Sequence, residues 1–177
     1  MSSKAKKAII NIFLDLIEEN EYEKISVTMI VDACNISRQT FYYHFRDIED
    51  MLKCVFKEES EKICNQLDVD NWHNSAQEYV GFFNRFDTAL RKMLLSSDFV
   101  LAYNLIYKSF YEYIADYYIS YQETRSAKRN EDGKVEFLIS YTASAITGLV
   151  IAELQKSKSD YNAILNKLWD NFKLNKK

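Results

Sequence analysis

Residues 25–53 read ISVTMIVDACNISRQTFYYHFRDIEDMLK, and this stretch holds two short amphipathic patterns joined by a three-residue turn. The first pattern places four apolar residues on one helix face behind Ser26, a good N-cap residue: Val27, Ile30, Val31 and Cys34. A helix of barely two turns persists only when other elements hold it by packing. The turn runs from Asn35 to Ser37, where asparagine tolerates left-handed backbone and Ser37 can cap the helix that follows.

The second pattern, residues 38–45, predicts a helix with one apolar face and one polar face. Phe41 and Phe45 lie four residues apart, so both point toward a core. The free faces carry hydrogen-bonding side chains: Arg38, Gln39, Thr40, Tyr42, Tyr43 and His44. Two short helices, a tight turn and one polar face are the layout of a helix-turn-helix, here about residues 26–45, whose second helix reads base edges in the major groove of DNA.

Composition predicts an all-α fold around this motif. The chain has 177 residues, 47% of them apolar, with no proline and three glycines. Strand-rich folds need many turn residues, so this scarcity favours long helices with few connections. Apolar periodicity predicts about eight to nine helices, of which eight can be placed, at 4–19, 27–34, 38–45, 48–66, 76–95, 99–121, 135–156 and 160–172.

The pattern divides the chain into an N-terminal three-helix helix-turn-helix domain, residues 1–53, and a C-terminal helical bundle domain, residues 54–177. No signal peptide and no uninterrupted membrane-spanning apolar run is expected. The three cysteines lack metal-binding spacing, so we expect packed thiols in a reduced cytoplasm. With two histidines and no catalytic or phosphate-binding motif, the sequence predicts no enzyme, no metal and no cofactor.

The charge balance is acidic overall and basic at the predicted reading helix. The net charge of the chain is −3, and residues 1–53 hold 7 basic and 9 acidic side chains, a balance of −2. Between Asn35 and Arg46, however, there are two arginines, one histidine and no acidic residue. Because contact with DNA depends on the charge at the contact surface, the sequence predicts binding through a few cationic contacts.

Residues 8–55 resemble the N-terminal DNA-binding domain of the TetR/AcrR family of transcriptional regulators. The resemblance rests on TFYYHF at 40–45, followed by a charged, capped helix start at Asp47. Asn35 departs from the family pattern, which has glycine in the turn, and Ile48 replaces a phosphate-contacting lysine. The resemblance implies phosphate and base contacts by the reading helix and by residues around it: Ser26, Ser37, Arg38, Gln39, Thr40, Tyr42, Tyr43, His44 and Lys7.

The resemblance also implies a cytoplasmic homodimer that binds a palindromic operator in double-stranded DNA and responds to a small-molecule effector or a partner protein. From the family we expect a repressor. The run RQTFYYHFRDIEDM at 38–51 resembles a subgroup that includes the activator of dihydroxyacetone kinase genes, so activation is a second expectation. The alternative is a helical protein-interaction module, or a partner-dependent co-activator, with weak or lost DNA binding; the acidic balance and Ile48 favour it.

Residues 99–121 carry seven of the 13 tyrosines, on more than one helix face. These rings are either core and surface side chains or the lining of a ligand pocket, in which phenol groups supply the polar points. The resemblance favours a pocket, since members of the family often sense small molecules in this part of the chain. The candidate lining residues are Phe82, Phe86, Tyr103, Tyr107, Phe110 and Tyr141.

The last two predicted helices combine many small residues with an apolar terminal helix. Small residues let helix backbones approach closely, which serves packing within one subunit as well as a two-fold four-helix dimer interface. The resemblance implies the dimer. The candidate interface residues are Ala145, Gly148, Leu149, Ala152, Ile164 and Leu168.

Overall fold

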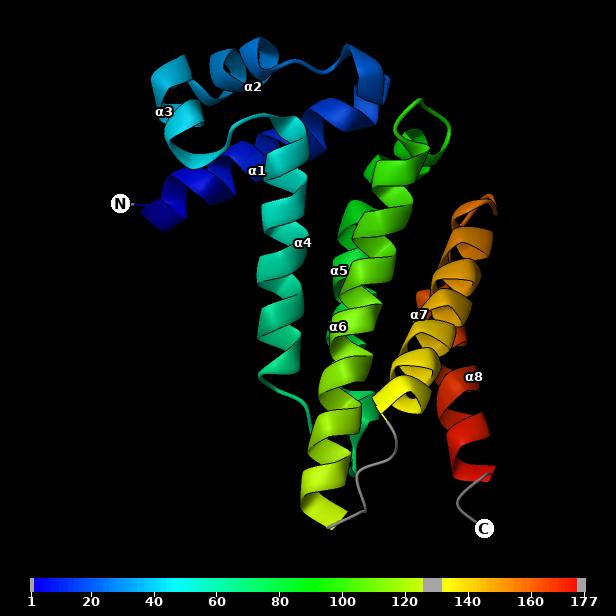
Figure 1. Ribbon diagram of the computed structural model, residues 1–177. Helices are drawn as coiled ribbons and strands as arrows, with labels where there is room; N and C mark the ends of the chain where they lie inside the picture. Colours follow the sequence, from blue (N-terminus) through cyan, green and yellow to red (C-terminus); the bar gives the residue numbers. More distant parts are fainter. Residues whose placement is uncertain (1, 126–131, 175–177) are drawn as a thin grey trace. The chain divides into compact units, whose positions relative to one another are not determined.

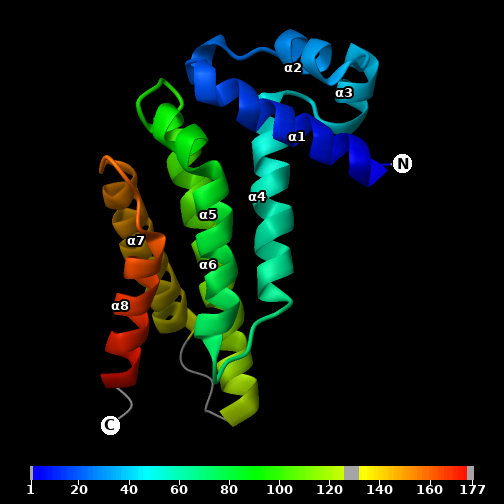
Figure 2. The ribbon, with the colours of Figure 1, turned by 180° about the vertical axis from the view of Figure 1, so that it is seen from behind.

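The computed structural model describes residues 2–125 and 132–174, which form helices joined by short connections (Figures 1 and 2). The all-α expectation is confirmed, since no strand occurs in either of these ranges. Every helix placed from periodicity is present, with ends that differ by at most four residues. The elements are α1 (Ser2–Glu19), the 3-10 turn η1 (Tyr22–Lys24), α2 (Val27–Cys34), α3 (Arg38–His44), α4 (Ile48–Cys64), α5 (Trp72–Leu94), α6 (Phe99–Arg125), α7 (Asp132–Leu154) and α8 (Tyr161–Leu174).

The chain divides into two compact units. Unit 1 comprises Met1–Phe56 and Phe86–Leu105, and unit 2 comprises Lys57–Arg85 and Ile106–Lys177. Helices α4, α5 and α6 therefore each contribute residues to both units. The helix-turn-helix lies wholly within unit 1, whereas a domain boundary at residue 53 stays a prediction.

Packing on α1 holds the helix-turn-helix of unit 1. Helix α1 contacts both α2 and α3. The Lys6 ammonium group lies 5.6 Å from the ring centroid of Phe45, the buried residue that ends α3. Burial of apolar side chains, rather than helix propensity, therefore stabilises two helices that are too short to persist alone. The fully buried side chains of these three helices include Ile9, Phe13, Ile17, Ile30 and Phe41.

The turn between α2 and α3 depends on one left-handed residue. Asn35 has φ 52° and ψ 46°, and no other non-glycine residue in the described ranges has a positive φ. Its N–H donates to the carbonyls of Asp32 and Val31, and the N–H of Ile36 donates to Val31, so the turn closes the end of α2. Asparagine enters this region at less cost than most residues that carry a Cβ, which explains why it can replace glycine here.

Serine side chains cap both helices of the motif, as the sequence predicts. The Ser26 hydroxyl oxygen accepts the N–H of Met29 at 3.3 Å, and that of Ser37 accepts the N–H of Thr40 at 3.1 Å. Each cap satisfies a backbone donor that the start of a helix leaves without a partner, and one such cap contributes about 1 kcal/mol.

Lys92 of α5 caps the C-terminal end of α1, and both Lys92 and α1 belong to unit 1. Its ammonium nitrogen donates to the carbonyl oxygens at 17, 18 and 20, at 2.6, 3.0 and 3.0 Å. A cation at this position complements the negative end of the helix dipole, and α1 has no basic residue in its own last turn. Beside it, the Glu23 carboxylate accepts the N–H and the hydroxyl of Ser97 at 3.0 and 2.9 Å. Lys92 thus joins α5 to the end of α1, and Glu23 joins η1 to the turn between α5 and α6.

Unit 2 is built from α7, α8 and the adjoining parts of α4, α5 and α6, whose ribbons are seen in Figures 1 and 2. Its core is rich in aromatic rings. Tyr79, Phe83 and Phe110 pack with ring centroids 5.3 to 6.1 Å apart. The Tyr79 hydroxyl donates to the Ser109 carbonyl at 3.0 Å. Burial raises the pKa of Tyr79 far above its ordinary value, so this hydroxyl is a neutral donor at physiological pH.

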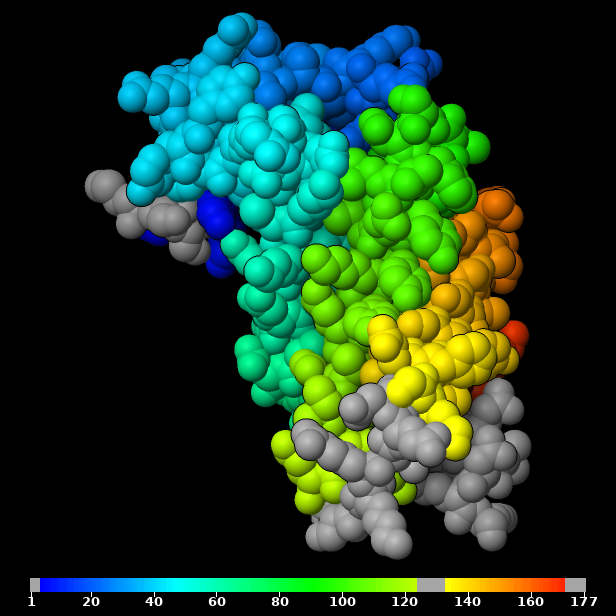
Figure 3. Space-filling model, viewed as in Figure 1, coloured from blue at the N-terminus to red at the C-terminus, as the bar shows by residue number. Residues whose placement is uncertain are grey.

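Helix α7 is apolar and poorly buried. Residues Gly133–Leu154 are long and apolar enough to cross a membrane, with a mean hydropathy of 1.6 in a window of which 22% is buried within the chain. One such helix is weak evidence of a membrane span, because helices of soluble proteins meet the same criterion. Side chains of α7 lie at the surface in Figure 3, in yellow to orange, and Phe137, Tyr141 and Leu149 are among the exposed ones.

We predict that Asn35→Ala lowers the free energy of unfolding by about 1 kcal/mol, because alanine is strained in left-handed backbone. Asn35→Gly removes that strain and should leave the stability unchanged or raise it. Urea denaturation followed by circular dichroism measures both changes. An equal loss in the two variants would show that the asparagine side chain, rather than the backbone conformation, holds the turn.

Candidate nucleic-acid interface

Helix α3 separates a buried face from an exposed one. Phe41 is 0% exposed and Phe45 is 2% exposed, whereas Tyr42 and Tyr43 are 56% and 80% exposed. Arg38 and Gln39 are exposed in the first turn of the same helix. Two large aromatic side chains beside exposed hydrogen-bonding groups, on a helix fixed from behind, form a surface suited to contact with another molecule.

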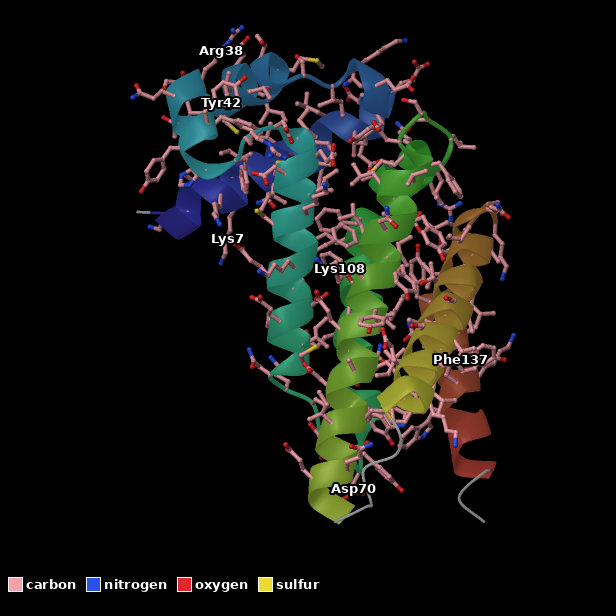
Figure 4. All side chains as sticks on the ribbon, in the orientation of Figure 1. Lys7, Arg38, Tyr42, Asp70, Lys108 and Phe137 are labelled. Carbon is pink, nitrogen blue, oxygen red and sulfur yellow. The ribbon has the colours of Figure 1, made fainter. Side chains whose placement is uncertain are left out.

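Arg38 is oriented by α2. Its Nη2 donates to the hydroxyl oxygen of Thr28 at 2.8 Å. Because the guanidinium group carries five N–H donors, this bond leaves others for a base edge or a phosphate. Thr28 is neutral, so it fixes the side chain without offsetting its positive charge. Figure 4 shows Arg38 above α2 and α3.

The other polar groups of α3 are held by their neighbours along the helix. The hydroxyl oxygens of Ser37 and Thr40 lie 2.9 Å apart, and the rings of Tyr43 and His44 meet edge to face with centroids 5.0 Å apart. A serine hydroxyl that accepts a backbone N–H can still donate its own proton to a phosphate. The predicted contact residues from Ser37 to His44 are therefore brought together on one short helix and its cap.

The start of α4 is acidic. Asp47 accepts the N–H of Asp50 at 2.7 Å, which confirms the predicted cap, and Asp50 accepts the N–H of Arg46 at 2.9 Å. The Arg46 guanidinium pairs with Asp47 at 3.2 Å. The bond from the Asp50 N–H, and after it Arg46, hold the pKa of Asp47 below its ordinary value, so the carboxylate is charged at neutral pH. The positive charge of Arg46 is thus offset, and a phosphate at this helix end would meet carboxylates.

The position of Ile48 is equally unsuited to an anion. This side chain is half-buried and lines a surface hollow together with four acidic residues, Glu23, Asp47, Glu49 and Asp98. Burial, and after it the charges of three of these carboxylates, raise the pKa of Tyr22 in the same hollow to about 12. The loss of the family's lysine therefore accompanies an anionic surface rather than an alternative phosphate contact.

Two of the predicted DNA contacts, Ser26 and Lys7, lie outside α3 and its cap. Ser26 lies near α3, whereas Lys7 does not. Ser26 is exposed at the start of α2, two residues before Thr28. Lys7 is exposed on α1, and in Figure 4 it lies below α1, whereas Arg38 lies above α2 and α3. The structure does not bring Lys7 and Arg38 together.

The geometry is that of a helix-turn-helix with a preformed turn, and residues 10–55 match the family described as bacterial regulatory proteins, tetR family. These residues form a TetR-family DNA-binding domain. The resemblance read from residues 40–45 is confirmed, and the protein is a DNA-binding regulator of transcription.

Two similar proteins match nearly the whole length of this chain. The HTH-type dhaKLM operon transcriptional activator DhaS of Lactococcus lactis subsp. lactis (strain IL1403) is 28% identical over 179 residues, which cover 96% of this chain and 91% of that protein. A solved structure of the dihydroxyacetone kinase operon activator DhaS matches with a TM-score of 0.73 and 24% identity, over 96% of this chain and 97% of that one. The second likeness shows that the fold is shared beyond the helix-turn-helix.

Unit 2 of this regulator contains two adjoining hollows, of about 70 and 280 Å³. They share four lining residues from α5, α6, α7 and α8, namely Trp72, Tyr113, Ile146 and Leu168. The smaller hollow lies among core rings that include Tyr79, Phe83, Phe110 and Tyr161, and the larger adds Ile114, Tyr117, Tyr118 and Thr142. A concave apolar space with a few polar groups is the ordinary form of a small-molecule site.

Of the six ligand candidates predicted from sequence, Phe110 lines the smaller hollow. Phe86 and Tyr103 belong to unit 1, and Tyr141 is 64% exposed on α7. Phe82 and Tyr107 line neither hollow.

The six residues predicted for the dimer interface also lie in two different places. Ile164 and Leu168 line the smaller hollow. The other four lie exposed along α7: Ala145, Gly148, Leu149 and Ala152.

The sequence interpretation missed several residues that the structure places at these sites, among them Thr28 and Trp72. Thr28 lies ten residues before Arg38, and the turn at Asn35 is what brings the two side chains within hydrogen-bonding distance. Trp72 precedes the start predicted for α5. Its spacing of four and seven residues to Ala76 and Tyr79 continues the apolar face of that helix and could have identified it.

We predict that Thr28→Val weakens operator binding roughly three- to ten-fold, the effect of one lost hydrogen bond, because Arg38 is no longer held in its contact orientation. Fluorescence anisotropy with labelled promoter DNA measures the change. Thr88→Val, on α5, is the matched control and should leave the affinity unchanged. In an Arg38→Ala background Thr28→Val should cost nothing further, so an additive loss would refute the positioning role.

Proposed function

We propose that this regulator binds a pseudo-palindromic operator as a homodimer, with α3 of each subunit in the major groove. The observation that carries the proposal is the exposed face of α3, held rigidly by the left-handed turn and the two serine caps. In this arrangement Arg38, Gln39 and Tyr43 contact base edges. The hydroxyls of Ser26, Ser37 and Thr40, together with Tyr42 and His44, contact the backbone, whereas Lys7 lies away from this surface and is left out of the proposed contacts. The regulator acts in the cytoplasm, where its operator lies.

An effector bound in unit 2 would change operator affinity by favouring one separation of the two reading helices. Because α4, α5 and α6 pass from unit 2 into unit 1, a change in one unit has a continuous helical route to the other. Such a ligand acts only through different affinities for the two states, so equal binding to both would leave DNA binding unaltered.

For the transcriptional output we favour activation over the repression expected from the family at large. Both similar proteins are named as operon activators, and the relative covers 96% of this chain. A dihydroxyacetone kinase operon is accordingly the first place to search for the operator. Repression is the alternative outcome, because the same contact represses when the operator overlaps a promoter.

Association of two copies would cover the exposed face of α7. The side chains on this face are small or apolar, with Ala145, Gly148 and Ala152 lying near Tyr141 and Leu149 along the helix. Phe137, labelled in Figure 4, stacks on Tyr141 with ring centroids 6.1 Å apart at the start of the face. Apart from the backbone of its own helix and its chain neighbours, a Cβ atom added to Gly148 would meet no atom within 4 Å, so packing inside the subunit does not require glycine there. Close approach of a second helix would require it.

The second candidate is an interaction module or partner-dependent co-activator with weak DNA binding. The charges of unit 1 favour it, since Arg46 is paired with Asp47 and Ile48 lies in an anionic hollow. Under this alternative the face of α3 would contact protein, and operator affinity would depend on a partner.

We predict that DNA from the promoter next to the regulator's own gene binds the purified protein, and that Arg38→Ala combined with Tyr43→Ala weakens binding roughly a hundred-fold. A fluorescence titration at several salt concentrations measures the affinity. Lys24→Ala removes one positive charge of unit 1 outside α3 and should change the affinity little. Unaltered binding in the double variant would overturn the assignment of α3, and binding that requires an added partner would favour the co-activator.

For the dimer, we predict a sedimentation mass of twice the 20.9 kDa chain at micromolar protein, and a mass near one chain for Gly148→Glu. Glutamate is a better helix former than glycine, so the subunit should keep its helicity while two buried charges separate the partners. Gly81→Glu is the matched control, because a Cβ at Gly81 also meets nothing within 4 Å. A wild-type mass near one chain would rule the homodimer out.

A further inference from the structure

We propose that the two adjoining hollows of unit 2 bind a small, uncharged, aromatic molecule. The proposal rests on the proposed function only where it takes this molecule to be the effector. The class of ligand follows from the size of the space, from the rings that line it, and from the polar groups that are already bonded within the protein.

The size of the space limits the ligand to one or two rings. The larger hollow measures about 280 Å³, and it meets the smaller one, of about 70 Å³, at Trp72, Tyr113, Ile146 and Leu168. A cavity of about 150 Å³ is sufficient for benzene. The space therefore accommodates a single ring with a short substituent or a fused pair of rings.

The rings around the space favour an aromatic occupant over a saturated one. Four of the eight residues that line the larger hollow are aromatic, and the smaller hollow continues into stacked core rings. Offset or edge-to-face packing of a ligand ring on these side chains gains more than the burial of its area alone. A saturated ring of equal size gains the burial but not the interaction between rings. The aromatic lining of the larger hollow is Trp72, Tyr113, Tyr117 and Tyr118.

The buried phenols already have partners, so the space offers little to a polyol. The Tyr113 hydroxyl donates to the Trp72 carbonyl at 2.9 Å and lies 2.7 Å from the Ser75 hydroxyl oxygen. Burial, as the main cause, raises the pKa of Tyr113 to about 12, so the group is neutral. Thr142, in the lining of the larger hollow, provides a further hydroxyl. A molecule with several hydroxyls would lose its hydration and find too few partners.

A charged ligand is also disfavoured. Among the described residues that line the two hollows, none carries a carboxylate, an ammonium or a guanidinium group. The faces of tyrosine and tryptophan rings attract a cation, but a cation that enters without a counter-charge gives up its hydration. An anion would lose its hydration and would also meet the negative faces of the rings. The neutral aromatic molecule is the class that the lining satisfies.

Benzyl alcohol and its saturated counterpart, cyclohexylmethanol, provide a matched pair of probes for the intact protein. The chain has two tryptophans, and their rings lie 5.2 Å apart with Trp72 in the lining, so tryptophan emission reports on the site directly. We expect benzyl alcohol to change this emission and to bind roughly three- to ten-fold more tightly than cyclohexylmethanol. Glycerol and benzyltrimethylammonium should bind more weakly than benzyl alcohol. Equal affinity for the matched pair, or tighter binding of the triol or the cation, would overturn the proposal.

Variants that fill the space locate the binding. Ile146→Phe places a ring where the two hollows meet, and calorimetry should show benzyl alcohol affinity reduced about ten-fold or more. Asn84→Phe adds the same ring at an exposed position of α5 and should leave the affinity unchanged. If Ile146→Phe loses its helical circular dichroism, Thr142→Phe fills the larger hollow from its partly exposed side. Unchanged affinity in a folded filling variant would show that the ligand binds elsewhere.

Titration of promoter DNA with the same samples separates this proposal from the proposed function. If the protein binds benzyl alcohol selectively but binds no DNA, the proposed ligand class is supported and the proposed operator binding is refuted. If it binds DNA but does not prefer benzyl alcohol, operator binding is supported and the proposed ligand class is refuted. Selective ligand binding without any effect on DNA affinity would keep the site and remove its role as an effector site.

Discussion

At Asn35 the backbone passes through the left-handed region, and the two short helices that it joins depend on this turn and on packing against α1 for their relative orientation. The turn determines more than the direction of α3. It brings Thr28 within 2.8 Å of Arg38, and it places Ser37 where its hydroxyl caps the helix. The face of α3 that we propose for DNA contact is thus preorganised, so little conformational entropy would remain to be lost on binding.

The electrostatic character of unit 1 makes this preorganisation necessary. A typical DNA-binding domain gains much of its affinity from many phosphate contacts made by basic side chains. Here Arg46 is paired with Asp47, and carboxylates surround Ile48 at the start of α4. Sequence-specific contacts from a few oriented side chains must therefore carry a larger share of the binding free energy. In the same unit, Lys92 joins α5 to the end of α1, and Glu23 joins η1 to the turn between α5 and α6, so the helix behind α3 is itself fixed.

The sequence predicts the fold well because helices are local. The period of the apolar residues defines each helix. Within the helix-turn-helix, Ser26 and Ser37 mark where the two helices begin and Asn35 marks where the first one ends, as the structure confirms. What the sequence could not supply are contacts between residues far apart in the chain. The bonds from Lys92 to carbonyls of α1 cross more than 70 residues, and no local pattern indicates them. Likewise, the tyrosines of α6 occupy several faces, so periodicity could not distinguish those that line a hollow from those that stack at the surface.

We propose that α3 and its cap form the surface that meets DNA. Amide chemical-shift mapping of the isotope-labelled protein during titration with promoter DNA tests this assignment most directly, because each residue reports its own environment. We predict the largest changes at residues 37–44 and at the start of α2, with small changes at the acidic start of α4. Large changes confined to α4 or to unit 2, with the amides of α3 unmoved, would contradict it.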